Sequence, residues 1–550
     1  MTLNKLKLYY FTIINLKLSQ ICYRVYYVIR NKFFGRRLVN TIDLNIKTSD
    51  LNYLTQFINY PNSFFKEKIT FEFLGKKKSF KSISEIVFDS QDYGELWCYN
   101  LNYFDFLNQN NNNFQLEKDL IFEWVERDYK SENIVWDPYP VSMRLVNLIK
   151  WFSKNFNKFD KKTKIYFLKL IKQHDLYLRK NIEFHLDGNH LLENYISLLI
   201  SSIFCNKDDL LESDFNNLNN EIKNQFLVDN FHYERSIMYH NILVEKLLNI
   251  IAIGQNKKHS SKFDNKLSNL HNSISKMLIV TNNFLYPTYS YPSFNDVVRY
   301  GDNRVIEIIK YSKNLKFNSI KKHKNINFEA SGYLKFELQN SIFIYDYGDI
   351  APKHIPGHGH CDCFSFEFFH NNIPIIVNTG TSTYEYGDRR FKERSTSAHN
   401  TISFGGNEQD EIWSRFRVAR QHTIEYFKLD SFTKNKLFFS GSLSNYNNQY
   451  KHKRNVSIEN NILTVNDKVE SFDKKSLPSL NLHFHPNVKI VRKSEDNFLI
   501  NETLVLEIKN TKNILLTDYL YADNYGNLIG SLKIEAVLIE NNSEILLKNI

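Results

Sequence analysis

The pattern of apolar positions changes once along the chain, from a helical period to a strand period. Between about residues 115 and 315, apolar residues recur every three or four positions, as at Ile165, Leu168, Ile171 and Leu178. The segment 190–200 repeats the pattern with Leu192, Tyr195 and Leu199. Residues with this spacing share one face of an amphipathic helix, so the region predicts several helices joined by short polar loops.

After about residue 325 the apolar residues come in short alternating runs rich in β-branched and aromatic side chains. Examples are the segments 332–338, 341–347, 373–380, 436–443 and 461–469, separated by Asn, Gly and Asp. This pattern is typical of a large antiparallel β-domain. The polar, lysine-rich segment 314–331 is the predicted linker between the helical and β regions.

A chain of 550 residues is too long for one ordinary hydrophobic core, and its hydrophobic content of 42% is sufficient for two or three. We expect a basic helical segment and lead-in over residues 1–90. An all-helical domain should follow over 91–320, and a β-domain over 326–550.

The formal net charge of +11 favours an acidic partner, such as nucleic acid, an anionic membrane or an acidic polysaccharide. The sequence contains no RNP-like, zinc-finger or helix-turn-helix pattern, so we do not expect nucleic acid. The five cysteines are odd in number and scattered, and they predict no disulfide framework.

The first 37 residues combine a basic start with an apolar run from Leu8 to Leu16 that Lys17 interrupts. The run is shorter than the ~18 apolar residues that span a bilayer, and no small-residue cleavage site of a signal peptide follows it. Two interpretations remain. The segment is either a basic amphipathic helix lying on a membrane or a first helix packed on the body of the protein.

The segment HLDGNHLLENY, residues 185–195, holds the first candidate site. A turn at Asp187 and Gly188 precedes a helix that begins near Asn189 and His190, and Glu193 lies one turn later on the face of His190. Because a helix N-terminus favours negative charge, a substrate carboxylate can bind there. In the alternative interpretation, Asn189 caps the helix and His190 is a surface residue.

Two further segments place titratable and aromatic residues together. Tyr239 lies among Glu234, Arg235 and His240, where a tyrosine can act as a proton donor or, with a lowered pKa, as a base. Trp136, Tyr139 and Arg144 are suited to sugar stacking and carboxylate pairing, although core packing explains them as well.

The segment GHGHCDCFSFEFF, residues 357–369, places two histidines beside an aspartate and two cysteines. If it is extended, His358, His360 and Asp362 share one face and the cysteines the other, which argues against a cysteine-based zinc site. His399, which follows Arg394, is a candidate third histidine of a metal or catalytic cluster. The segment between them contains Asn378, Tyr384 and Tyr386.

Five motifs in this order resemble the heparinase II/III superfamily of polysaccharide lyases. They are GNHLLEN, ERSIMYHN, HGHCDCFSFEF, IPIIVNTGTSTYEY and RSTSAHNTISFGGNEQDE. The resemblance implies an incomplete α/α toroid followed by an antiparallel β-sandwich, and β-elimination at a uronic acid of an acidic polysaccharide. It also implies the periplasm or cell envelope as the location. The missing export signal indicates the cytoplasm as an alternative, and the cell's own surface glycan as the substrate.

The resemblance also implies roles for individual residues. Asn189 and His190 face the uronate carboxylate and the C5 proton, Tyr239 is the acid and in some members also the base, and His358 reaches the site from the β-domain. The residues expected near the substrate are Glu193, Arg144, Trp136, Tyr139, Glu234, Tyr384, Tyr386 and Arg394.

In several members of the superfamily, the counterparts of His360 and His399 bind a structural metal ion together with an aspartate. Here the corresponding position is Asn378, a neutral and poor ligand for zinc. We therefore expect weak zinc binding, or a cluster joined by hydrogen bonds from the Asn378 amide to the imidazoles. Asp362 or a nearby backbone group is a possible substitute ligand.

Two alternatives to a lyase are a glycoside hydrolase on the same toroid and a non-catalytic glycan-binding or assembly protein. A hydrolase needs two opposed carboxylates, for which Glu193 and Glu234 are the only obvious pair. A binding protein would not need Asn189, His190, Tyr239 and His358 together, so their joint presence argues against it.

Overall fold

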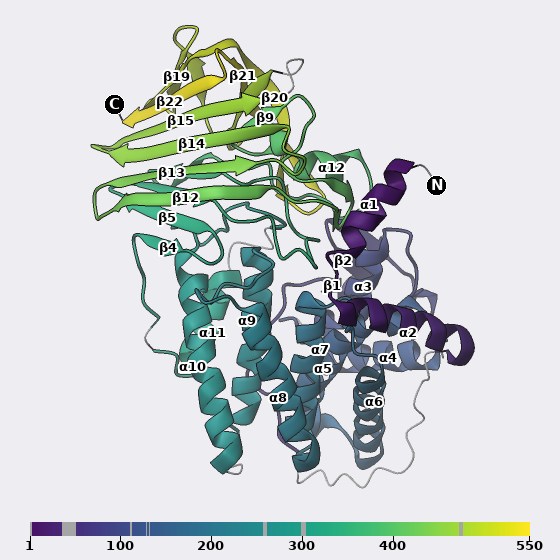
Figure 1. Cartoon of the computed structure of the whole chain (residues 1–550). Helices are drawn as coiled ribbons and strands as arrows, with labels where there is room; N and C mark the ends of the chain where they lie inside the picture. Colours follow the sequence, from purple (N-terminus) through teal and green to yellow (C-terminus); the bar gives the residue numbers. More distant parts are fainter. Residues whose placement is uncertain are drawn as a thin grey trace.

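The computed structural model consists of a helical domain followed by a β-domain that lies against one end of it (Figure 1). It describes residues 3–35, 51–110, 113–127, 129–130, 133–256, 261–298, 304–318, 320–471 and 477–549. The helices are α1 (Leu3–Ile13), α2 (Leu18–Phe34), α3 (Glu95–Tyr103), α4 (Phe114–Glu126), α5 (Pro138–Asn155), α6 (Lys161–Lys180), α7 (Gly188–Phe204), α8 (Asp208–Gln225), α9 (Ile237–Gly254), α10 (Ser261–Asn283), α11 (Arg304–Asn314) and α12 (Asp388–Arg394).

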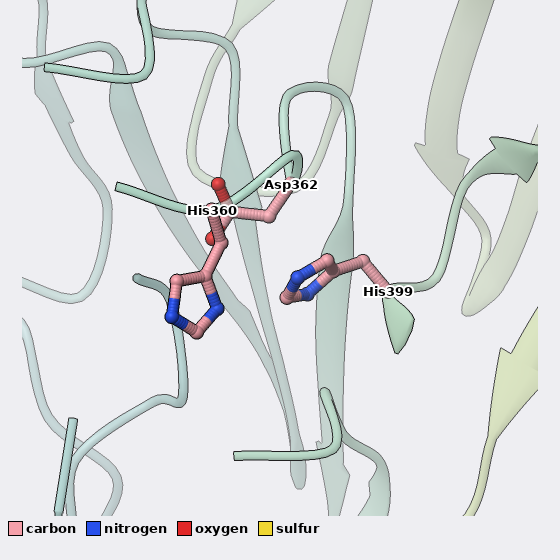
Figure 2. Close-up of side chains that lie close together, drawn as sticks. All are labelled: His360, Asp362 and His399. Atoms are coloured by element: carbon pink, nitrogen blue, oxygen red, sulfur yellow. The ribbon is translucent and has the colours of Figure 1, made fainter. Parts of the chain in front are cut away.

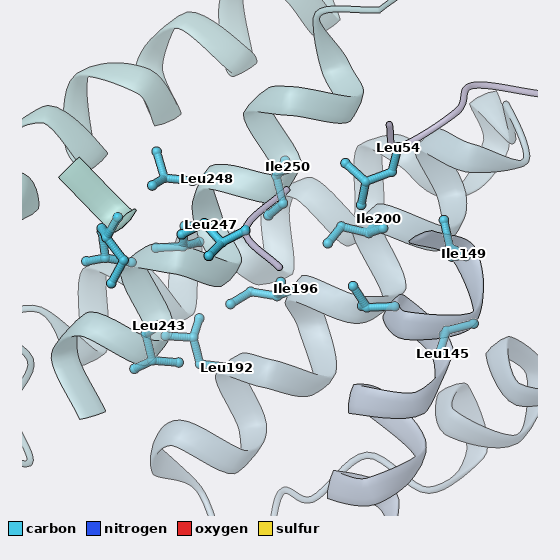
Figure 3. Packing of buried hydrophobic residues seen from close by; sticks show 14 of the residues in the cluster. Leu54, Leu145, Ile149, Leu192, Ile196, Ile200, Leu243, Leu247, Leu248 and Ile250 are labelled. Atoms are coloured by element: carbon cyan, nitrogen blue, oxygen red, sulfur yellow. The ribbon is translucent and has the colours of Figure 1, made fainter. Parts of the chain in front are cut away.

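Helix α7 is the central helix of the helical domain. It packs against α5, α8 and α9, and nearly all of its residues are buried, including Ile196 and Ile200 between the apolar side chains of α5 and α9 (Figure 3). The predicted face of α6 is largely buried too, although Ile165 is 44% exposed. Helix α9 is the one described helix with the length and composition of a membrane span. Because 89% of that window is buried, we interpret it as a core helix.

The strands pair in antiparallel sheets throughout the described residues. They are β1 (Phe64–Phe65), β2 (Thr70–Phe73), β3 (Lys76–Ser79), β4 (Ile326–Phe328), β5 (Tyr333–Leu338), β6 (Ser341–Asp346), β7 (Phe366–His370), β8 (Ile373–Ile376), β9 (Ile402–Phe404), β10 (Ile412–Ser414), β11 (Arg417–Val418), β12 (Thr423–Phe432), β13 (Leu437–Ser444), β14 (Tyr450–Glu459), β15 (Ile462–Ser471), β16 (Pro478–His483), β17 (Ile490–Arg492), β18 (Asn497–Ile500), β19 (Leu504–Lys509), β20 (Thr511–Asn524), β21 (Asn527–Leu538) and β22 (Asn542–Asn549).

Three of these sheets build the β-sandwich. One has the strand order β12-β13-β14-β15-β22-β19-β18-β17, and the other two have the orders β4-β5-β6-β7-β8 and β20-β21-β16-β9. Apolar side chains from all three sheets, among them Phe366, Leu482 and Val465, form a single core. The helical-then-β order agrees with the predicted fold class.

The segment 357–365 is not the predicted strand. The structure places it in a loop, and strand β7 begins only at Phe366. Phe364 has a φ of 63°, a left-handed conformation that interrupts an extended chain. Because the segment is a loop, the positions of His358 and His360 are not set by the alternation of a strand, and both histidines contact the Asp296 carboxylate.

Helices α1 and α2 are joined by a short turn, and this two-helix segment, which we call the hairpin, contacts both domains. On the β-domain, the Trp413 indole N–H donates to the Thr12 hydroxyl at 3.0 Å. On the helical domain, the Lys17 ammonium lies 2.8 Å from the Asp187 carboxylate, and Tyr23 stacks on Phe184. The inner face of α2 therefore packs on the body of the protein, as one of the two interpretations of this segment predicts.

Candidate functional site

The candidate site begins at the tight turn before α7. Asp187 caps the helix by accepting the Gly188 N–H at 2.9 Å. Gly188 has a φ of +59°, and a Cβ there would lie 2.5 Å from a Glu234 carboxylate oxygen and 2.3 Å from the Ile355 side chain. Only glycine fits this position, and its absent side chain lets Glu234 approach the helix N-terminus.

Asn189 is held by Glu234. Its backbone N–H donates to Glu234 Oε1 at 2.7 Å, and its side-chain amide donates to both carboxylate oxygens at 3.1 and 3.0 Å. Glu234 Oε2 also lies 3.5 Å from His358 Nε2. Glu234 is 1% exposed. Because it is bonded to Asn189 and lies beside His358, it positions these two residues, whereas the sequence predicted a direct contact with substrate.

His190 forms a pair with a buried carboxylate. Its Nδ1 lies 3.2 Å from Glu183 Oε1, and its ring packs on Tyr139 at a centroid distance of 4.4 Å. Burial acts to lower the pKa of His190, but the charge and hydrogen bond of Glu183 raise it overall. When Nδ1–H donates to Glu183, Nε2 is left as the basic nitrogen, and the side chain is 33% exposed.

A pocket of about 210 Å³ opens beside His190. Helix α2 forms one wall of it through Tyr27 and Arg30, and Tyr99 and Asp137 lie among the residues of the helical domain that line it. Aromatic, cationic and carboxylate side chains within one pocket suit a sugar ligand.

On the other side of the site, Tyr239 packs face to face on His358. The two ring centroids are 3.9 Å apart, and the Tyr239 hydroxyl donates to the Tyr384 hydroxyl at 3.3 Å. Burial raises the pKa of Tyr239 well above its ordinary value, so its hydroxyl remains protonated near neutral pH. These contacts support the predicted positions of Tyr239, His358 and Tyr384, whereas Tyr386 is 70% exposed and packs on Phe391 instead.

Asp296 connects the groups of the site and was missed by sequence reasoning. Its carboxylate lies 2.9 Å from His358 Nδ1, 2.9 Å from His360 Nε2 and 2.7 Å from the guanidinium of Arg390. Burial acts to raise the pKa of Asp296, but Arg390 and the two histidines hold it well below its usual range. Asp296 lies in a loop after α10, outside every recognised motif, so no local signal marked it.

His360, Asp362 and His399 converge in the β-domain (Figure 2). Their ligand atoms lie within 4.8 Å of one another, and all three side chains are buried. His360 Nδ1 and the ring nitrogens of His399 have no hydrogen-bond partner among the described residues. Burial lowers the pKa of His360 to about 4, so its imidazole is neutral at physiological pH. Two neutral imidazoles and a carboxylate are a donor set that fits a zinc ion.

Asn378 does not make the hydrogen bonds to the imidazoles that are one of its two predicted roles. Its carbonyl oxygen accepts the Ser365 hydroxyl at 2.7 Å, and its amide nitrogen has no hydrogen-bond partner in the described part of the chain, so it does not join the imidazoles. The carboxylate that lies beside the two imidazoles is that of Asp362. Burial raises the pKa of Asp362 to about 7.

Arg144 and Trp136 belong to the core and not to the substrate site, which corrects their predicted roles. The Arg144 guanidinium donates to His174, to the Asn102 carbonyl and to the Val135 carbonyl at 2.8–2.9 Å. Trp136 is 4% exposed. The Arg144 donors are bonded within the protein, and the Trp136 ring packs on His174 and Tyr177, so neither side chain is available to a substrate.

Arg394 and Glu193 also differ from the prediction. Arg394 is fully buried, and its guanidinium donates to the carbonyls of Gly359 and Ser414, so it fixes the histidine loop instead of binding substrate. Glu193 is 1% exposed, one turn below His190, and burial raises its pKa. Because Glu193 is enclosed and Glu234 is bonded to Asn189, the carboxylate pair that a hydrolase needs does not face an open cleft.

Comparison with known proteins identifies two family models. Residues 78–324 match the heparinase II/III N-terminus, and residues 321–525 match the heparinase II/III-like C-terminal domain. A search of curated proteins finds no match.

Solved structures share the fold at low identity. One titled heparinase III aligns with a TM-score of 0.67 and 15% identity over 98% of this chain and 93% of its own. A second, a heparinase III gene product, has a TM-score of 0.61 and 16% identity over 84% and 81%. A heparan sulfate lyase from Pedobacter heparinus has a TM-score of 0.56 and 15% identity over 86% and 80%.

Proposed function

Because the chain belongs to the heparinase II/III family of polysaccharide lyases, we propose that it cleaves a uronic-acid polysaccharide by β-elimination. One observation carries the proposal. Tyr239 packs on His358, and the same site contains the separate pair of His190 and Glu183. The reaction needs an acid and a base with distinct pKa values. Tyr239 is suited to be the acid and His190 to be the base.

In the proposed mechanism, the Asn189 amide and His190 face the uronate. Hydrogen bonds to the C6 carboxylate reduce its charge and make the C5 proton more acidic. His190 Nε2 takes that proton, and Glu183 stabilises the imidazolium that forms. The Tyr239 hydroxyl donates its proton to the glycosidic oxygen at C4, so the C4–O bond breaks and a C4–C5 double bond forms.

The nature of the product tests this reaction. We expect the ultraviolet absorbance of an unsaturated uronate to grow with cleavage, and each new non-reducing end to lack one water relative to hydrolysis. Mass analysis of products from acidic glycans, including the producing cell's own surface polysaccharide, distinguishes the two. Chain shortening with a gain of water and no absorbance would show that the protein is a hydrolase and not a lyase.

For the substrate, we propose a carboxylated glycan with little sulfate, such as the cell's own surface polysaccharide. The pocket beside His190 offers one guanidinium, that of Arg30, to a uronate carboxylate, while the carboxylates of Asp137 and Glu183 would repel an additional sulfate. Turnover of an unsulfated uronic-acid polysaccharide should exceed that of its sulfated form. A preference for the sulfated form would contradict this part of the proposal.

We also propose that His360, Asp362 and His399 hold a structural zinc ion. A bound ion would tie the histidine loop to the segment that carries His399, and its loss should lower stability more than it changes chemistry. Elemental analysis of protein purified without chelator should find zinc in the wild type and in Asn378→Ala, and not in Asp362→Asn. The thermal midpoint should fall in parallel with the metal content. Equal zinc in all three proteins would remove Asp362 from the site.

A further inference from the structure

Helix α2 has its polar and apolar faces reversed relative to an ordinary surface helix. Its polar side packs on the protein: Gln20 is 2% exposed and donates to the Leu186 carbonyl, and Arg30 donates to the Asn181 side chain at 2.7 Å. Its apolar side faces outward, with Val25 53% and Ile29 51% exposed. An ordinary surface helix would bury these two residues.

Helix α1 also exposes apolar side chains to solvent. Of the 28 large apolar side chains exposed in the described structure, 12 lie in the hairpin 3–34. These 12, which we call the apolar face, are Leu3, Leu6, Tyr10, Ile13, Ile14, Leu18, Val25, Tyr26, Val28, Ile29, Phe33 and Phe34. Such a concentration of exposed apolar groups marks an interaction surface.

The charge of the hairpin identifies the kind of partner. Residues 3–34 contain six Lys and Arg and no Asp or Glu, in a chain with 60 acidic residues. Lys17 and Arg30 bind the body of the protein, and the other basic residues, which are all exposed, are Lys5, Lys7, Arg24 and Lys32. Anionic lipids attract a basic segment of this kind, and the acyl boundary accepts its apolar side chains. A symmetric dimer through this face would instead bring two purely basic surfaces together.

The hairpin is held in place, so the apolar face cannot simply fold inward. Beyond the Lys17 and Trp413 contacts, Tyr27 donates to the Ile182 carbonyl at 2.5 Å, and Asn15 donates to the Ala419 carbonyl at 3.2 Å. Both domains therefore fix the orientation of the face. We propose that the apolar face of α1–α2 docks on an anionic membrane surface.

Docking would also place the candidate site next to the lipid. The inner face of α2, through Tyr27 and Arg30, lines the pocket beside His190, while the outer face of the same helix carries Val25 and Ile29. One helix thus separates the pocket from the proposed membrane surface. The docking itself does not depend on the lyase reaction, and its test needs no substrate.

Sedimentation of the full chain with lipid vesicles tests the proposal. The wild type should bind vesicles that contain phosphatidylglycerol at least 10-fold more tightly than vesicles of phosphatidylcholine, and added salt should weaken the binding. Val25→Glu/Ile29→Glu should reduce binding at least 10-fold, and Lys5→Glu/Lys7→Glu should reduce it specifically for anionic vesicles. Val228→Glu, at a 94% exposed site in the helical domain, is the matched control and should bind as the wild type does.

Three outcomes would overturn the proposal. The wild type could fail to bind either vesicle, or bind both without any effect of the hairpin substitutions. It could also form a dimer that Val25→Glu/Ile29→Glu dissociates, which would make a second copy the occupant. If that double variant does not fold, as judged by its thermal transition, the salt dependence and the Lys5→Glu/Lys7→Glu comparison still decide the question.

Discussion

At the scale of single residues, the proposed division between acid and base rests on environment. Burial keeps the Tyr239 hydroxyl protonated, which suits an acid and not a base. Tyr239→Phe should therefore lose on the order of 100-fold in kcat with little change in KM, because only proton donation is removed. Steady-state kinetics on the cleaved glycan measures this, with the exposed Tyr386→Phe as a control that should leave turnover unchanged. Near-normal turnover of Tyr239→Phe would take Tyr239 out of the mechanism.

The base makes a second prediction at this scale. Glu183 raises the pKa of His190 above the ordinary value of 6.5, and a base must be deprotonated to act. The kcat/KM of the wild type should therefore rise with pH along a limb that lies above pH 6.5. Glu183→Gln removes the negative charge, so the His190 pKa should fall and the limb should move to lower pH. A limb that stays in place in the variant would assign it to another group.

At the scale of elements, a buried charge cluster holds the loops of the site to the β-sandwich. Arg454 on β14 pairs with Asp467 on β15 at 2.6 Å, and its guanidinium also donates to the carbonyls of Phe364 and Asn400. Burial acts to raise the pKa of Asp467, but Arg454 and His452 lower it overall. Because this folded pKa is depressed, the stabilisation is present above the unfolded pKa of about 3.9 and is lost as the pH falls toward the folded value.

Asp467→Asn should lower the free energy of unfolding by about 3–5 kcal/mol, because it leaves the Arg454 charge buried without its counter-ion. Chemical denaturation at neutral pH measures the loss, and Glu470→Gln in the exposed pair with Lys453 is the control, with an expected change of about 0–1 kcal/mol. The deficit of Asp467→Asn should shrink in acid, where the wild-type carboxylate is also protonated. A deficit independent of pH would show that the ion pair is not its source.

At the scale of the whole molecule, Asp296 and Arg390 join the helical domain to the β-domain through a buried ion pair. Arg390→Met should destabilise the protein by about 3–5 kcal/mol and separate the thermal unfolding of the two domains, because the buried Asp296 carboxylate loses the guanidinium charge and keeps only its hydrogen bonds to the histidines. Calorimetry shows whether one transition becomes two. Arg415→Met, in the more exposed interdomain pair with Glu95, should keep the wild-type transition. Equal effects of the two substitutions would contradict the special role of Asp296.

The amino-acid sequence by itself determined the order of helical and β regions and the five motifs of the family. Both are local properties: helix and strand periods are carried by neighbouring residues, and a motif is read within a few positions. Tyr239, His358 and Tyr384 also meet as the motifs indicated.

Only the tertiary structure decided which side chains face the site and which are enclosed. Arg144, Trp136 and Arg394 have the chemistry of sugar-binding residues, but their environment is a core, and burial depends on elements distant in sequence. Asp296 contacts residues 62–94 positions away, so no local pattern could mark it. The left-handed conformation of Phe364 interrupts the expected strand, and the approach of His399 to His360 and Asp362 joins segments that are more than 35 positions apart in the sequence.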